Sequence, residues 1–224
     1  MKSIKITLIS CLIVLATGTS FAQTTAIGLR VGTTYFTLNN DEINEEAKST
    51  LGVDLAIPVE FRLSPVFSVQ PELHFTQKGV QFEDVVNGEE QTIAVKTNYL
   101  ELPVLLKANF GAQRLKGYAF VAPSIGYATN RFLSEKLGDA DRVKEEVEFI
   151  ETEAAKSRRW DFSAIGGVGA SLPAGAGAIV MDVRYSFGLS DNTKFNDEAP
   201  DDWEKTTNRG CTLSVGYMLP IGGK

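Results

Sequence analysis

The 224-residue chain has little of several features that define other classes of protein. It contains one histidine and two cysteines, and acidic residues outnumber basic ones, giving a formal net charge of -6. This excludes the strongly basic footprint of a nucleic-acid-binding protein. Beyond 4–16 no apolar run approaches the roughly 20 residues of a spanning helix. The chain also lacks a phosphate-cradling loop, a CxxC pair and zinc-ligand spacing, so we predict no cofactor and no metal site.

The amino terminus predicts an export signal. Lys2 and Lys5 precede the apolar core 6–16, and 20–22 (Ser-Phe-Ala) places small residues where a signal peptidase reads them. We therefore expect a signal peptide over 1–22, with a retained anchor as the alternative, and one mature domain over 23–224. Cleavage removes two lysines and takes the formal charge from -6 to -8.

The mature chain keeps only one cysteine, Cys211, because Cys11 lies in the signal. No intramolecular disulfide can form, so stability must come from burial and strand pairing. An unpaired thiol in an oxidising compartment is tolerable if it is buried or faces lipid.

Apolar residues alternate with polar or small residues over long stretches of the mature chain. From Leu51 to Leu63 every odd position is apolar, which is period two over thirteen residues. Such a pattern predicts a strand with one apolar face. The segments that show it are 27–37, 51–63, 66–82, 93–110, 117–133, 159–172, 179–189 and 211–219. In the fourth of these the phase changes, which predicts a β-bulge near 98–100. Prolines 58, 71, 103 and 123 are the weakest part of this interpretation, because a proline removes a ladder hydrogen bond.

The connections between these eight strands alternate strictly between short and long. Residues 63–66, 111–116 and 173–177 are short turns, whereas 38–50, 83–91, 134–158 and 190–208 are long and mostly acidic. Four long connections then share one end of the sheet, and three short turns share the other with both termini. This is the arrangement of an outer-membrane barrel. We predict an all-β fold: an eight-stranded antiparallel up-and-down transmembrane β-barrel.

The polar face of the strands distinguishes this fold from a soluble periplasmic ligand-binding barrel, which would turn its apolar face inward. Here the second face is largely small or uncharged, which suits a narrow lumen better than a solvated exterior. Its charges have both signs and can pair with one another. They are Arg30, Asp54, Glu60, Arg62, Glu72, Lys78, Glu101, Lys107, Asp161, Asp182 and Arg184.

We predict a structural charge network in the lumen, with no catalytic or cofactor-binding residue. Its members are Arg30, Glu60, Arg62, Glu72, His74, Glu101, Lys107, Asp182 and Arg184. Strand phase places His74 on the lumen side beside Glu72 and Thr76, where a hydrogen-bonded histidine is favoured over a catalytic one. Eight strands enclose a lumen just wide enough for side chains, so a sealed polar core is favoured over a small-solute pore.

Aromatic residues gather toward the predicted strand ends, where we expect them at the membrane interface. They are Tyr35, Phe36, Phe82, Tyr99, Phe110, Tyr118, Phe132, Trp160 and Tyr217.

Two of the long connections suggest further structure. Val143, Val147 and Ile150 have helical spacing, so the segment 134–158 forms either a short amphipathic helix or a solvated flexible tip. The acidic segment 191–204 lacks the glycine and the terminal glutamate of an EF-hand, so it favours diffuse attraction of divalent ions over a calcium site.

Four segments resemble the Bacteroidetes outer-membrane β-barrel family, also called the porin family or PorT-like proteins. They are 28–32 (GLRVG), 71–79 (PELHFTQKG), 99–107 (YLELPVLLK) and 184–189 (RYSFGL). The resemblance spans about 26–219 and implies a barrel in the outer membrane of a Gram-negative bacterium. One departure is the end of the chain, since such barrels commonly end on an aromatic residue that the assembly machinery reads, whereas here Tyr217 is followed by seven further residues.

These patterns favour a non-enzymatic outer-membrane protein that serves envelope structure, adhesion or partner binding. The expected partners are outer-membrane lipid and lipopolysaccharide, the assembly machinery and an envelope protein, with no nucleic acid. The resemblance alone suggests the alternative of a component of a secretion or gliding apparatus.

Overall fold

The computed structural model describes residues 25–40, 47–86, 88–112, 115–138, 140–152, 155–195, 200 and 203–221. The predicted signal peptide, 1–22, lies outside them. The strands are β1 (Thr25–Asn39), β2 (Lys48–Arg62), β3 (Phe67–Val86), β4 (Glu89–Ala112), β5 (Leu115–Leu137), β6 (Val143–Val147), β7 (Ala155–Ser157), β8 (Trp160–Ala174), β9 (Gly177–Gly188), β10 (Thr193–Phe195) and β11 (Thr207–Ile221). Within these ranges no helix is long and apolar enough to cross a membrane.

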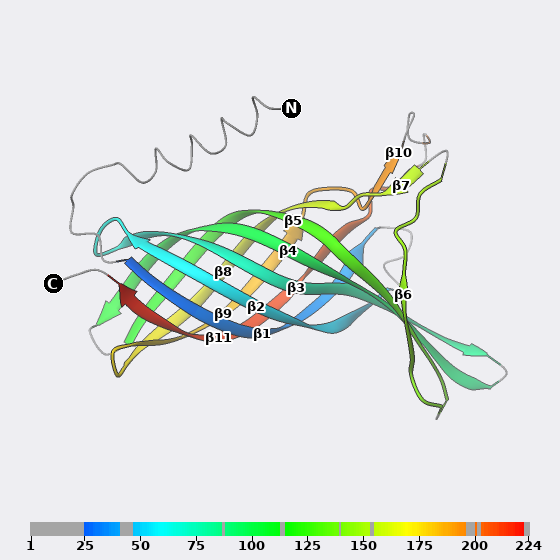
Figure 1. Ribbon diagram of the computed structural model, residues 1–224, viewed down its shortest axis with the longest axis horizontal. Coiled ribbons are helices and arrows are strands. Elements are labelled where there is room, and N and C mark those ends of the chain that lie inside the picture. Colours follow the sequence, from blue (N-terminus) through cyan, green and yellow to red (C-terminus); the bar gives the residue numbers. More distant parts are fainter. Residues whose placement is uncertain are drawn as a thin grey trace.

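Eight long strands form a ring. β1 pairs antiparallel with β2, β2 with β3, β3 with β4 and β4 with β5. β5 then pairs with β8, β8 with β9 and β9 with β11, and β11 returns to β1. Every one of the eight therefore has a partner on both sides, and Figure 1 shows the strands winding obliquely around a barrel. All eight predicted segments coincide with one of these strands. The predicted all-β antiparallel barrel is confirmed.

The strands β3, β4 and β5 continue past the ring at the end that carries the long connections (Figure 1). Residues 83–91, predicted to be a long loop, instead continue the paired hairpin of β3 and β4 through Val86 and Glu89. Gly88 has a φ of 85°, a conformation that glycine adopts without strain. The long-loop prediction is thus wrong for this connection.

The connection between β5 and β8 contains a short strand and not the amphipathic helix that the spacing of its apolar residues suggested. The segment Val143–Val147 is β6, which pairs with β5 opposite Arg131–Glu135. Beyond Tyr127, toward the long-connection end, β8 no longer pairs with β5, so this edge of β5 is open to the short strand. Backbone hydrogen bonds to that open edge therefore hold this segment as a strand, although Val143 and Val147 have helical spacing.

A bulge lies opposite residue 98 as predicted, but on the neighbouring strand β5 and not in the fourth segment itself. The register of β4 and β5 shifts between Asn98 and Tyr99, where Thr129 is the extra residue on β5. The four prolines lie inside paired strands, Pro58 in β2, Pro71 in β3, Pro103 in β4 and Pro123 in β5. The prolines therefore do not contradict the strand prediction.

Alternation separates the wall into two faces. Large apolar side chains are exposed on the outside of all eight strands, for example Leu29 at 67% and Val121 at 62%. The inward positions are buried and mostly polar or charged, with scattered apolar residues and one apolar cluster of Leu105, Tyr118, Phe120, Ala122 and Ile165. This is the reverse of a soluble ligand-binding barrel, so that alternative is wrong.

Three of the nine aromatic residues predicted at the interface lie inside the barrel instead. Phe36, Tyr99 and Tyr118 are buried, whereas Tyr35, Phe110, Trp160 and Tyr217 are exposed on the outer face, and Phe82 and Phe132 are half-buried. The reason is strand phase, because a residue near a strand end still points in or out according to its parity. The centroids of the three buried rings lie 4.2 to 5.3 Å from the ammonium nitrogen of Lys78 or Lys107.

Two glycines of β8 make room for interior rings of β5. A Cβ on Gly169 would lie 2.4 Å from Cζ of Tyr118, and one on Gly167 would lie 2.4 Å from Cζ of Phe120. The absence of side chains there lets both rings cross the inner face of the neighbouring strand, so small residues on β8 and large ones on β5 together fill the barrel.

Candidate functional site: the interior charge network

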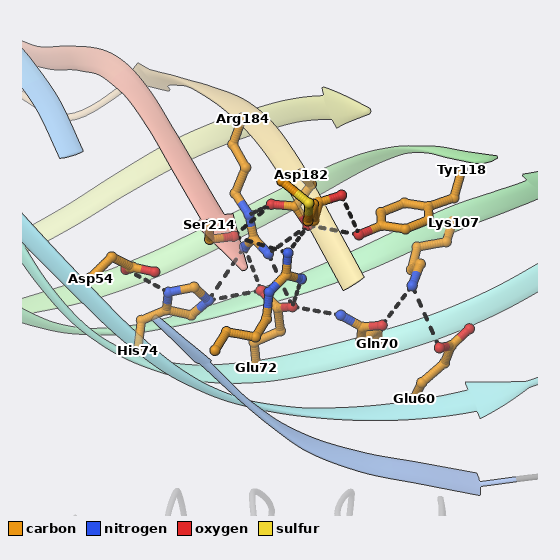
Figure 2. Close-up of polar contacts among 12 residues, drawn as sticks. Asp54, Glu60, Gln70, Glu72, His74, Lys107, Tyr118, Asp182, Arg184 and Ser214 are labelled. Carbon is orange, nitrogen blue, oxygen red and sulfur yellow. Dashed lines mark hydrogen bonds and ion pairs between the residues drawn. The ribbon is translucent and has the colours of Figure 1, made fainter. Parts of the chain in front are cut away.

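The inward faces of five strands bring together two groups of ionised side chains. Figure 2 shows the group around Glu72, Asp182 and Arg184. We call Arg30, Glu72, Asp182 and Arg184 the central network, and Lys78, Glu101 and Asp161 the upper network, which lies toward the long connections. The central residues come from β1, β3 and β9, and the upper residues from β3, β4 and β8. Because β1, β3 and β9 do not all neighbour one another, the contacts cross the lumen instead of following the sheet.

Two guanidinium groups hold two carboxylates in the central network. Arg184 donates from Nε to Asp182 Oδ1 over 2.9 Å and from a terminal nitrogen to Glu72 Oε1 over 3.2 Å. Arg30 donates to Glu72 Oε1 over 3.3 Å and also pairs with Asp182. All four side chains are at most 3% exposed. Each buried charge thus meets two partners of opposite sign, which offsets its desolvation.

Hydroxyl groups complete the coordination of Asp182. Ser214 donates to Oδ1 over 2.9 Å and Tyr118 donates to Oδ2 over 3.0 Å. Because β9 pairs with β11, Ser214 lies directly opposite Asp182 in the register. Asp182 therefore accepts from both guanidinium groups and from two hydroxyl groups.

His74 lies between two carboxylates. Its Nδ1 is 2.8 Å from Asp54 Oδ1, and its Nε2 is 2.7 Å from Glu72 Oε2. An ionised carboxylate can only accept hydrogen bonds, so both contacts are satisfied when the ring carries a proton on each nitrogen. In this arrangement no ring nitrogen is left to accept a proton from a hydroxyl nucleophile, as a serine-histidine catalyst requires.

The network extends from Glu72 to the short-turn end of the barrel. Gln70 donates to Glu72 and accepts from the Lys107 ammonium over 2.7 Å, and that ammonium lies 3.5 Å from Glu60 Oε2. Beyond Lys107 a cavity of about 200 Å³ opens toward this end, lined in part by Glu60, Arg62, Lys107 and Lys116.

Arg62 was predicted to belong to the lumen network, and the structure corrects this. Its side chain is 45% exposed, and its Nε lies 4.0 Å from Glu60 Oε1. Strand phase turns Arg62 inward, but it is the last residue of β2, so it lies at the rim, where water solvates it. The other eight predicted residues are buried on the inner face: Arg30, Glu60, Glu72, His74, Glu101, Lys107, Asp182 and Arg184.

The upper network depends on one cation. The Lys78 ammonium lies 2.9 Å from Glu101 Oε1 and 2.9 Å from Asp161 Oδ2. Neutral donors supplement it, since Ser190 donates to Asp161 over 3.1 Å and Asn208 donates to it over 3.3 Å. These two residues come from the long connection before β11 and from β11 itself, so the upper network also anchors the chain at the long-connection end.

Three residues that contact the network were not predicted to do so: Gln70, Ser214 and Tyr118, which was expected at the membrane interface. Strand parity places each on the inner face, and that signal was available. What parity does not reveal is contact across the lumen, such as the hydrogen bond from Tyr118 of β5 to Asp182 of β9. Among the residues described, no group of three histidine, cysteine or acidic side chains has the geometry to hold a metal ion.

Comparison with known families identifies the chain. The family described as outer membrane protein beta-barrel domain matches residues 21–194. The protein belongs to this family. That membership, together with the apolar exterior, locates it in the outer membrane.

Several solved outer-membrane barrels are similar to this chain in fold. Neisserial surface protein A shares 12% identity over 88% of this chain and 99% of its own, with a TM-score of 0.45. The attachment invasion locus protein Ail of Yersinia pestis shares 12% identity with the same coverage and a TM-score of 0.42. The Escherichia coli outer membrane protease OmpT shares 10% over 92% and 99%, with a TM-score of 0.49. No curated protein matches the sequence.

Proposed function

We propose that the protein is a non-enzymatic outer-membrane barrel whose ion-paired interior closes the lumen and whose wall carries acidic connections into the medium. The observation that carries this proposal is the position of the central network, where side chains of β1, β3 and β9 meet across the lumen. A solute would have to break ion pairs among side chains at most 3% exposed in order to pass.

The distribution of acids supports an outward-facing role for the long connections. The segments 38–50, 83–91, 134–158 and 190–208 hold 22 of the 28 acidic residues but only 8 of the 22 basic ones. The six remaining acids all face the interior: Asp54, Glu60, Glu72, Glu101, Asp161 and Asp182. In outer-membrane barrels the longer connections face the outside. We infer that this acidic end presents a surface for adhesion or for an envelope partner.

Planar-bilayer recording of the refolded full chain tests the closed lumen. We expect no stable single-channel steps, because ion-paired side chains of β1, β3 and β9 meet across the lumen. Large, stable steps with the wild-type chain would overturn the closed-lumen proposal. The variant Arg184→Ala is the matched comparison, since removing this guanidinium opens space and charge in the centre, and we expect it to raise the frequency of current steps.

The resemblance of segments 71–79 and 99–107 to PorT-like proteins of the Bacteroidetes supports a second proposal, a component of a secretion or gliding apparatus. Chemical crosslinking of intact cells, followed by isolation of the barrel, separates the two proposals. Stoichiometric recovery with the same set of several envelope proteins favours the apparatus, whereas recovery with lipid alone or with a single envelope partner favours the first proposal. Insertion by the outer-membrane assembly machinery is part of both.

A further inference from the structure

Three cations gather on the outer side of the β4–β5–β6 extension: Lys96, Arg142 and Lys144. Lys96 of β4 is paired with Phe132 of β5, and the ammonium of Lys144 lies 4.2 Å from the centroid of the Phe132 ring. The two lysines thus flank one aromatic ring. Arg142 immediately precedes β6, the strand that carries Lys144.

The depth of these cations is fixed by a contact with β2. The ammonium of Lys96 donates to the backbone carbonyl of Leu51 over 2.6 Å. Leu51 is 61% exposed and is the first of the apolar residues on the outside of β2, at the long-connection end. The cations therefore lie at the border of the apolar outer band, which is the level of the lipid headgroups.

The positive charge of this group has no carboxylate partner among the described residues. In the part of the chain that the structure describes, no ion pair joins Lys96, Arg142 or Lys144 to a carboxylate. Glu146, which is paired with Phe132, accepts a hydrogen bond from Asn130 over 2.5 Å. Partial burial lowers the pKa of Lys96, and the charges of Arg142 and Lys144 lower it further. Mutually repelling cations at an otherwise acidic end indicate an anion supplied from outside.

We propose that Lys96, Arg142 and Lys144 bind the phosphate groups of lipopolysaccharide in the outer leaflet. The inference rests on the proposed orientation, with the long connections outside. Lipopolysaccharide fits better than a free anion, because its phosphates are held at the depth of Leu51 while its acyl chains lie against the apolar band below. Juxtamembrane cations each strengthen binding to an anionic lipid surface. Phe132, between the two lysines, supplies an apolar surface for the lipid.

The test compares lipopolysaccharide binding by the refolded full chain and by the triple variant Lys96→Gln/Arg142→Gln/Lys144→Gln. Fluorescent lipopolysaccharide is titrated into each protein in neutral detergent micelles, and heat-modifiable gel migration verifies that each is folded. We expect the triple variant to bind at least about tenfold more weakly, given several-fold per cation. The exposed single variant Lys144→Gln should retain the fold in any case, with a loss of about fivefold.

A charge-matched control separates a site from a general charge effect. The variant Lys156→Gln/Lys194→Gln/Lys205→Gln removes three cations at the same end of the barrel but outside the cluster. We expect its affinity to stay within about twofold of wild type, because none of these lysines lies on β4, β5 or β6. An equal loss in both triple variants would overturn the proposal.

The source of the anion is tested by two further ligands. Dephosphorylated lipopolysaccharide should bind wild type as weakly as the intact ligand binds the triple variant, and equal binding of both forms overturns the proposal. Displacement of lipopolysaccharide by inorganic phosphate at equal concentration would indicate a free-anion site and also overturn it. None of these outcomes depends on conductance, so a conducting lumen would refute the closed barrel without touching this inference.

Discussion

The two interior networks both bury carboxylates but differ in the number of cations that pair with them. In the central network two guanidinium groups share Glu72 and Asp182, and His74 supplies one further donor to Glu72. In the upper network a single ammonium, that of Lys78, serves both Glu101 and Asp161. The five donors of a guanidinium allow this sharing, whereas the ammonium has three. The central network therefore has redundancy, and the upper network depends on one side chain.

Loss of Lys78 should have the largest effect. The substitution Lys78→Met leaves Glu101 and Asp161 buried without a cation, which costs about 3–5 kcal/mol of unfolding free energy. Urea unfolding of the refolded barrel, followed by tryptophan fluorescence, measures it. Adding Glu101→Gln and Asp161→Asn in the same chain should restore part of the loss, because amides carry no charge. A triple variant no more stable than Lys78→Met alone would contradict this account.

Loss of one central guanidinium should cost less. In Arg184→Met the carboxylates keep Arg30 and His74 as partners, so we expect a loss of about 2–3 kcal/mol, at the lower edge of the range for a broken buried pair. The same unfolding measurement applies, with Arg209→Met in β11 as the control for removing an arginine that makes no described ion pair. If Arg184→Met proved more damaging than Lys78→Met, the central network would have no redundancy.

Removal of one neutral donor gives a smaller change. Tyr118→Phe keeps the ring between β5 and β8 but deletes the hydrogen bond to Asp182, which should lower stability by about 1 kcal/mol. If Asp182 depends on its guanidinium partners more than on its hydroxyl partners, this loss should be well below that of Arg184→Met. Comparable losses for the two variants would contradict that ranking.

The rim sets the lower limit of the comparison. Arg62→Gln removes a cation that is 45% exposed and 4.0 Å from Glu60, so we expect a change below about 0.5 kcal/mol. Raising the salt concentration screens this exposed pair, so the small difference in unfolding free energy between Arg62→Gln and wild type should disappear. A loss comparable to that of Arg184→Met would return Arg62 to the interior network.

Parity along the strands predicted the ring and most of the inner face, because a side chain in a strand has only two directions. It failed where the strands outlast the apolar band. Residues 83–91 carry one valine on each face, Val85 and Val86, among otherwise mostly polar residues, so periodicity carries no signal there. The Asn-Gly pair at 87–88 was nevertheless a strong hairpin signal. Contacts across the lumen, such as Lys78 with Asp161, depend on strand tilt and stagger, which a one-dimensional pattern does not contain.

The pairing of β1 with β11 has a consequence for how the barrel assembles. This seam joins the first strand to the last over fifteen residue pairs, from Thr25 with Ile221 to Asn39 with Thr207. Arg30 on β1 reaches Ser214 on β11 and Asp182 on the strand behind it. The contact with Ser214 cannot form until β11 has paired with β1. Closure of the barrel therefore pairs the backbone seam and completes the hydrogen bonds of Arg30, and a chain shortened before β11 would leave an open edge on β1 and deprive Arg30 of its Ser214 partner.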